Sequence, residues 1–157
     1  MALIIVSVIF LFDQISKILA TKILLLNQPV SIIKGVLNFT LVHNRGAAFG
    51  MLKNQLPLFI ITSAGAITLI YISLKGNKQA RLTLYNFALS LILAGALGNL
   101  VDRLFFGYVI DFIDFRVWPV FNIADSAITV GAVLLGYSIL FVRSQPKTPA
   151  CRQAGNT

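Results

Sequence analysis

Residues 82–101 read LTLYNFALSLILAGALGNLV, and this stretch decides the fold. It contains no charged residue, and about 20 apolar residues suffice for a helix to cross roughly 30 Å of hydrocarbon. The small residues at 94–98 (AGALG) allow a second helix backbone to come close. Asp102 follows the stretch directly. These features predict a membrane helix that packs tightly against a neighbour and ends at a carboxylate.

Three other apolar segments are long enough to cross a membrane: residues 2–24, 56–74 and 120–142. The chain is 57% hydrophobic and 11% charged, whereas soluble domains carry about 25% charged residues. We therefore expect an all-α membrane protein with four transmembrane helices. Residues 1–145 form its single domain, and residues 146–157 form a polar, disordered tail. The net charge of +8 fits basic residues beside membrane spans better than nucleic-acid binding.

Two connections lie outside these spans. Between the first two spans, apolar and polar residues alternate with the period of a strand: Leu37, Asn38, Phe39, Thr40 and Leu41. A turn at residues 44–46 (NRG) follows, and then an apolar segment at residues 47–49 (AAF). We expect a small extracytoplasmic β-hairpin there. Residues 104–119, which join the third and fourth spans, are rich in aromatic residues that favour the headgroup region. We expect them to form an extracytoplasmic loop.

The five acidic residues of the chain are all aspartates. A carboxylate at membrane depth costs about 2.5–3.5 kcal/mol on insertion scales, so retained acids indicate function. Alternating spans bring most polar side chains to one membrane face: Asp13, Lys17, Asn44, Asn99, Asp102, Asp111, Asp114, Asn122 and Asp125. The opposite face receives basic residues only: Lys75, Lys78, Arg81, Arg143, Lys147 and Arg152. Positive loops mark the cytoplasm, so we expect both termini inside and the polar cluster at the outer leaflet.

Two N-x-x-D elements, Asn99 to Asp102 and Asn122 to Asp125, carry the candidate chemistry. Residues three apart share a helix face, so each amide can orient its own carboxylate. Two neighbouring carboxylates share a proton; one then activates water while the other polarises a carbonyl. We interpret Asp102 and Asp125 as such a pair. Purely structural hydrogen bonds by the two asparagines remain an alternative.

The remaining polar residues support less specific interpretations. Asp13 and Lys17, four residues apart, can form a buried ion pair with a structural or a functional role. Asp111 and Asp114 are expected to be solvated or to shape a loop. A single histidine and the lack of glutamate exclude an H-E-x-x-H zinc site. We expect that histidine, His43, to be a hydrogen-bonded loop residue.

Five motifs, in order along the chain, resemble those of bacterial lipoprotein signal peptidase, also called signal peptidase II. They are DQISK (13–17), NRGAAF (44–49), GALGNLVDR (95–103), VIDF (109–112) and FNIADS (121–126). The resemblance implies an aspartic endopeptidase of the bacterial inner membrane that cleaves prolipoproteins just before a diacylglyceryl-modified cysteine. Asp102 and Asp125 then match the catalytic pair, and other positions match residues that support the site or bind substrate: Asp13, Lys17, Asn44, Gly98, Asn99, Arg103, Asn122 and Ala124.

The same resemblance implies a β-cradle at 36–49, membrane lipids as partners, inhibition by globomycin, and no metal or organic cofactor. We expect a monomer. Two other functions remain open from the residues alone. One is an ion-conducting bundle, which would need polar groups through the full membrane depth; the inner halves of the second and fourth spans lack ionisable residues. The other is a scaffold subunit packed through small residues, which leaves the two N-x-x-D elements unexplained.

Overall fold

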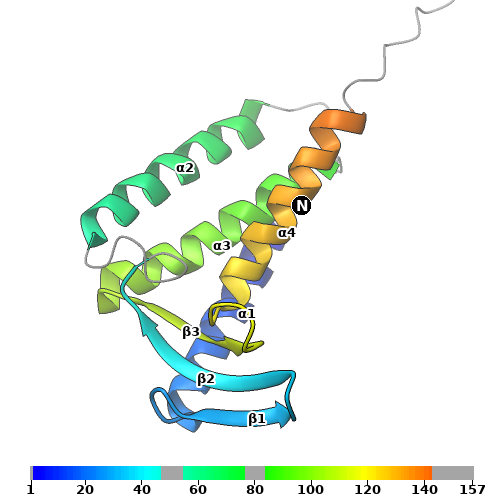
Figure 1. Cartoon of the computed structure of the whole chain (residues 1–157). Coiled ribbons are helices and arrows are strands. Elements are labelled where there is room, and N and C mark those ends of the chain that lie inside the picture. Colours follow the sequence, from blue (N-terminus) through cyan, green and yellow to red (C-terminus); the bar gives the residue numbers. More distant parts are fainter. Residues whose placement is uncertain (1, 47–54, 77–83, 143–157) are drawn as a thin grey trace, which may run out of the picture.

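Four helices form the body of the protein, and a small sheet lies across one end of them (Figure 1). The computed structural model describes residues 2–46, 55–76 and 84–142. The helices are α1 (Ala2–Ile23), α2 (Leu56–Gly76), α3 (Leu84–Phe106) and α4 (Ile123–Tyr137), and a π-helical turn, η2 (Ser138–Val142), continues α4. All four helical segments are long and apolar enough to cross a membrane. The prediction of four transmembrane helices is therefore confirmed.

Helix α3 is central, because it packs against α1, α2 and α4. Two glycines make this close approach possible. A Cβ atom on Gly95 would collide with the backbone carbonyl of Ala124, and one on Gly98 would meet the carboxylate of Asp13. The small residues of α3 thus bring α1 and α4 close enough for polar contacts between the three helices.

The sheet has three antiparallel strands in the order β1 (Pro29–Ile33), β2 (Leu37–Asn44) and β3 (Val109–Asp114). A small hairpin is confirmed, but its strands are β1 and β2, which are joined through residues 34–36; the turn expected at residues 44–46 lies instead at the end of β2. The third strand was not predicted: α3 continues to Phe106, and the chain then turns at Gly107, whose φ of +76 favours glycine. Part of the predicted cradle, residues 47–49, and the tail at 146–157 lie outside the described residues.

The sheet is joined to the helices by a small apolar core. Leu41, Ile110 and Phe112 pack together with Ala20 of α1. Backbone hydrogen bonds in both directions between Ile113 and Phe121, of 2.8 and 3.0 Å, then lead the chain into α4. The end of α1, the end of α3, the start of α4 and the sheet therefore meet at one end of the bundle.

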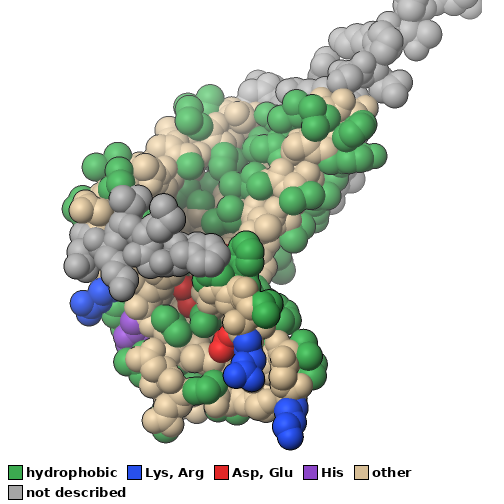
Figure 2. Space-filling view, viewed as in Figure 1, with side chains coloured by type: hydrophobic (Ala, Val, Ile, Leu, Met, Phe, Trp, Pro, Cys, Tyr) green, Lys and Arg blue, Asp and Glu red, His purple; other side chains and the backbone are tan. Residues whose placement is uncertain are grey.

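The surface of the molecule is divided in the same way. In the view of Figure 2, hydrophobic side chains cover the helical body, whereas the visible Lys, Arg, His and Asp side chains lie at the sheet end. Large apolar residues such as Leu3 of α1 and Leu69 of α2 are well exposed. Such continuous apolar surface is suited to contact with lipid.

The glycine contacts of α3 predict a specific sensitivity of folding. Gly95→Ala places a methyl group against the Ala124 carbonyl, and overpacking of this kind costs about 1–3 kcal/mol. We expect a lower unfolding temperature for the detergent-solubilised variant. Gly136→Ala is the matched control, because nothing lies within 4 Å of the added atom. Equal unfolding temperatures for the two variants would contradict this packing.

Candidate active site

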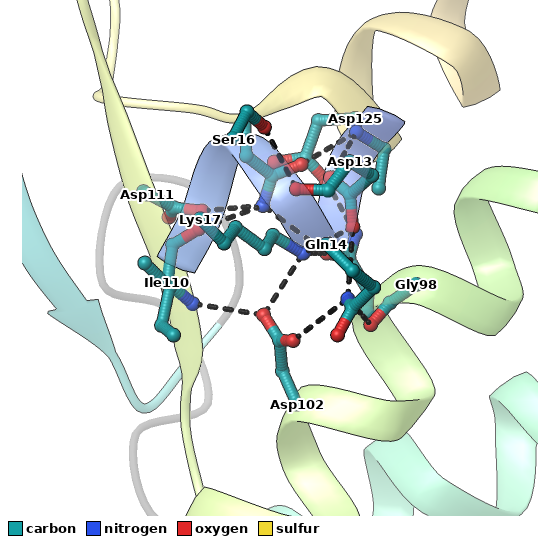
Figure 3. A network of polar contacts seen from close by, with 12 residues as sticks. Asp13, Gln14, Ser16, Lys17, Gly98, Asp102, Ile110, Asp111 and Asp125 are labelled. Atoms are coloured by element: carbon teal, nitrogen blue, oxygen red, sulfur yellow. Dashed lines mark hydrogen bonds and ion pairs between the residues drawn. The ribbon is translucent and has the colours of Figure 1, made fainter. Parts of the chain in front are cut away.

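A buried ammonium group organises the polar end of the bundle. Lys17, 1% exposed, places its Nζ atom 2.8 Å from Asp13 Oδ2 and 2.8 Å from Asp102 Oδ2. It also donates to Asn99 Oδ1 at 3.1 Å. Figure 3 shows Lys17 reaching from α1 toward Asp102 on α3. The predicted contact between Asp13 and Lys17 is confirmed, and each of the three ammonium donors has an acceptor.

The two aspartates that bind Lys17 also hold the backbone of two other elements. Asp13 Oδ1 accepts from the backbone N–H of Ala124 at 2.8 Å, at the start of α4. Asp102 Oδ2 accepts from the backbone N–H of Ile110 at 3.1 Å, on β3. Gln14 Nε2 adds contacts of 3.1 Å to Asp13 and 3.2 Å to Asp102 (Figure 3). This bridging glutamine lies inside the DQISK motif, but no role was assigned to it from the sequence.

The two asparagines orient carboxylates on other elements. Asn99 Nδ2 donates to Asp125 Oδ1 at 2.7 Å, so the prediction that Asn99 orients Asp102 is wrong. Asn122 is the N-cap of α4, and its Oδ1 accepts from the backbone N–H of Asp125 at 2.8 Å. Its Nδ2 donates to Asp111 Oδ1 at 2.7 Å. Asn122 therefore connects Asp111 with the start of α4.

Asp111 is 1% exposed on β3, so the expectation of a solvated loop residue is wrong. Its position is set by pairing with β2, where it lies opposite Val42. Asn44 Nδ2 donates to its second oxygen, Oδ2, at 2.9 Å. Burial raises the pKa of Asp111 to about 7, and the charge of Asp125 contributes to the rise. The hydrogen bonds from Asn44 and Asn122 act in the opposite direction.

Asp114 and His43 lie at the edge of this cluster. Asp114 accepts hydrogen bonds from Thr40 Oγ1 at 2.7 Å and from the backbone N–H of Arg116 at 2.8 Å, which confirms its loop-shaping role. His43 lies on β2 and stacks on Tyr108 with ring centroids 4.0 Å apart, so its expected place in a loop is wrong. Burial and the nearby charge of Arg45 lower the pKa of His43.

Two cavities flank Asp125. The first, of about 310 Å³, lies between α2, α3, α4 and the sheet; we call it the polar cavity, and its lining includes Asn44, Phe59, Arg103, Val120 and Asp125. The second, of about 410 Å³, is called the aromatic cavity and is lined by Phe115, Trp118, Phe121, Asp125, Ser126, Thr129 and Val130. Asp125 lines both cavities, whereas neither Asp102 nor Asp111 is among the residues that line them.

All of the sequence-predicted site residues are close to this cluster. Asp13, Lys17, Asn99 and Asp102 form the ion-pair network, whereas Asn44, Asn122 and Asp125 surround Asp111. Gly98 and Ala124 leave room for Asp13 between the helices. Arg103 lines the polar cavity, with its guanidinium 5.0 Å from the centre of the Phe59 ring. The arrangement holds Asp125 beside space for a ligand, with the carboxylate of Asp111 buried next to it.

Comparison with known proteins agrees with this arrangement. A family model described as "Signal peptidase (SPase) II" matches residues 5–141. A "Lipoprotein signal peptidase" of Caldanaerobacter subterraneus subsp. tengcongensis is 49% identical, over 90% of this chain and 97% of its own length. One of Halothermothrix orenii is 42% identical, over 94% and 98%.

The fold also matches a solved protein. A bacterial membrane enzyme, 32% identical, superposes with a TM-score of 0.85 over 95% of this chain and 93% of its own. The resemblance inferred from the five motifs is thereby confirmed. The chain belongs to the signal peptidase II family of lipoprotein signal peptidases, which are aspartic peptidases.

Proposed function

We propose that this protein removes the signal peptides of diacylglyceryl-modified prolipoproteins by cleaving before the lipid-bearing cysteine, and that Asp111 and Asp125 are its catalytic pair. The observation that carries the pairing is that Asn122 bonds to both residues: it donates to Asp111 Oδ1 and accepts from the backbone N–H of Asp125. Buried Asp111 therefore has the carboxylate of half-buried Asp125 as a neighbour, and that charge helps to raise the pKa of Asp111 to about 7. Asp125 also lines both cavities. The substrate class follows from the named activity of relatives that are 42–49% identical.

Asp111 replaces Asp102 in the pair expected from the sequence. Asp102 is bound by Lys17, by Gln14 and by the backbone N–H of Ile110. These contacts support a positioning role for Asp102, because its charge is paired with Lys17 and its bond to Ile110 ties β3 to α3. Asp111 has neutral amides as hydrogen-bond donors and a charged neighbour in Asp125.

The two carboxylates have different roles in the proposed reaction. A pKa of about 7 leaves about half of the Asp111 carboxyls protonated at neutral pH, and in this form Asp111 donates a hydrogen bond to the scissile carbonyl oxygen. Asp125 takes a proton from a water molecule, whose oxygen attacks the carbonyl carbon. When the C–N bond of the tetrahedral intermediate breaks, Asp125 returns the proton to the departing cysteine nitrogen. The products are the free signal peptide and a lipoprotein with a new amino terminus.

The position of the pair suits a substrate that leaves a membrane. A signal peptide is an apolar helix, and the bond to be cut lies where that helix emerges from the bilayer. Asp111 on β3 and Asp125 at the start of α4 lie at the sheet end of the bundle. Lipid on the substrate cysteine provides binding energy away from the reacting atoms, which holds the peptide in place. No metal or organic cofactor enters the proposed reaction.

Replacing the aspartates separates catalytic from positioning roles. Asp111→Asn and Asp125→Asn should lower kcat by about 10²–10⁴-fold while the proteins still fold and bind globomycin. Asp102→Asn should mainly lower the unfolding temperature, because Lys17 loses a charged partner. Cleavage of a diacylglyceryl-modified prolipoprotein, followed by gel shift, measures the first effect.

The matched control is Asp114→Asn on the same strand, which should keep its activity because Asp114 contacts Thr40 and Arg116 instead of the pair. Retained turnover in Asp111→Asn would disprove the proposed pair. So would a stable but inactive Asp102→Asn variant beside an active Asp111→Asn variant.

The pH dependence of cleavage provides a second test. Activity should fall above pH 7 as Asp111 loses its proton. The hydrogen bond from Asn44 stabilises the charged form and so lowers this pKa; Asn44→Ala should therefore move the alkaline limb of the kcat profile to higher pH. Thr40→Val, which removes a bond to Asp114 on the same strand pair, should leave the limb in place. If the alkaline limbs of the kcat profiles of wild type and Asn44→Ala coincide, titration of Asp111 is excluded as the cause of the activity loss.

We also propose that both termini are cytoplasmic and that the catalytic pair faces the outer leaflet of the inner membrane, because the loop between α2 and α3 and the tail carry basic residues only. Cys151, the single cysteine of the chain, is a natural probe. A membrane-impermeant maleimide should label it only after the cells are permeabilised. An engineered Ser31→Cys on β1 should react in cells whose inner membrane is intact. The reverse pattern would invert the orientation.

A further inference from the structure

The walls of the aromatic cavity are mainly apolar, apart from the carboxylate of Asp125 and two hydroxyl groups. Its two hydroxyl groups donate to the carbonyls of their own chain: Ser126 Oγ to Asn122 O at 3.0 Å, and Thr129 Oγ1 to Asp125 O at 2.8 Å. Aromatic rings and Val130 supply most of the remaining lining. A peptide backbone in this space would need partners for its N–H groups, whereas a hydrocarbon chain has no such groups.

The polar cavity adjoins the aromatic cavity, with which it shares Trp118, Phe121, Asp125 and Thr129, but it also has polar groups that the aromatic cavity lacks. Arg103 and Asn44 line it. A guanidinium carries five N–H donors, and an amide carries donors and an acceptor. One Arg103 donor reaches Asn99 O at 3.4 Å, so this side chain has further donors that can meet peptide carbonyls. The two cavities therefore suit chemically different halves of one ligand.

We propose that the aromatic cavity binds the acyl chains of the substrate's diacylglyceryl group, while the signal peptide occupies the adjoining polar cavity. This inference rests on the proposed function, and it assigns the lipid and the peptide of the substrate to separate cavities. The cavity volume of about 410 Å³ lies within the usual range of about 300–1,000 Å³ for ligand sites.

The course of α4 gives the lipid a path into the membrane. The helix begins at the sheet end and continues into the apolar body (Figure 1). Val130 lies more than one turn beyond Asp125 and is 51% exposed, so the cavity opens toward hydrocarbon. An acyl chain attached near the scissile bond can follow this wall directly into the bilayer without crossing a polar surface.

The opposite wall is held in a fixed shape before any ligand binds. Phe115 stacks on Phe121 with ring centroids 5.8 Å apart. Asp114 Oδ1 accepts from the backbone N–H of Arg116, which has a φ of +66. These contacts fix the turn that presents Trp118. A preformed wall binds a flexible chain with less loss of conformational freedom.

Acyl-chain length is the variable that tests this inference. We compare kcat/KM for two synthetic prolipoprotein peptides whose cysteine carries dipalmitoylglyceryl or dibutanoylglyceryl, in bicelles of constant composition. Wild type should favour the palmitoyl substrate by at least about tenfold, since methylenes bound in an apolar pocket discriminate by about that factor or more. Val130→Trp, which fills the aromatic cavity, should abolish this preference.

Val120→Trp is the matched control, because Val120 lines the polar cavity and not the aromatic one. It should lower cleavage of both substrates equally and keep the preference. The ratio of the kcat/KM values of one variant for the two substrates does not depend on the fraction of enzyme that is folded. An unchanged preference in Val130→Trp, or a lost one in Val120→Trp, overturns the inference. If wild type cleaves either peptide, the proposed function stands even when the lipid-site inference fails. If wild type cleaves neither peptide, the proposed function itself is disproved.

A second measurement does not depend on filling the cavity or on turnover. A substrate with a diazirine at the end of one acyl chain is irradiated on Asp125→Asn, and the labelled peptides are mapped. Labels that exceed those from a diazirine phospholipid should fall on Phe115, Ser126 and Val130, which line the aromatic cavity but not the polar one. Excess labelling of Phe59 or Arg103 would place the lipid in the polar cavity and overturn the inference.

Discussion

The structure depends on the burial of one ammonium group. A charge removed from water is tolerated only when it is paired and hydrogen-bonded, and Lys17 meets this condition through Asp13, Asp102 and Asn99. The remaining bonds of the two aspartates hold Ala124 on α4 and Ile110 on β3. A single cation therefore fixes α1, α3, α4 and the sheet relative to one another. Across residues 2–46, 55–76 and 84–142, every buried side-chain nitrogen and oxygen has a hydrogen-bond partner, so the network is complete in the described part of the chain.

The catalytic pair takes its geometry from this network. Asn99 Oδ1 accepts from both Lys17 and Asn122, which leaves the amide nitrogen of Asn99 to donate to Asp125. Asn122 in turn caps α4 and donates to Asp111. The orientation of each amide is thus determined by the buried cation and passed on to a carboxylate. Asp111 and Asp125 come from a strand and a helix, and this hydrogen-bonded connection, together with the sheet, keeps them as neighbours.

Much of this arrangement can be predicted from sequence, and the failures share a physical cause. Four spans follow from hydropathy, and the hairpin follows from alternation at 37–41. The clustering of polar side chains at one membrane face follows from the alternating up-and-down direction of the four spans. Strand β3 was missed because VIDFID has no polar–apolar alternation and is buried by tertiary pairing with β2. For the same reason the sequence predicts a solvated Asp111, which the structure shows to be buried. The spacing of Asn99 and Asp102 correctly predicts that both lie near the end of α3. Spacing within one helix cannot predict contacts with another helix, and the Asn99 amide donates to Asp125 on α4.

The central claim is that Asp111 and Asp125 share a proton near neutral pH. Infrared difference spectroscopy of the purified protein tests it most directly, because a protonated carboxyl has its own stretching band. The account predicts a carboxyl band that disappears on titration with a midpoint at pH about 7. This band should be absent in Asp111→Asn and present in Asp102→Asn. A titrating band that survives in Asp111→Asn and vanishes in Asp102→Asn would contradict the account and return Asp102 to the catalytic pair.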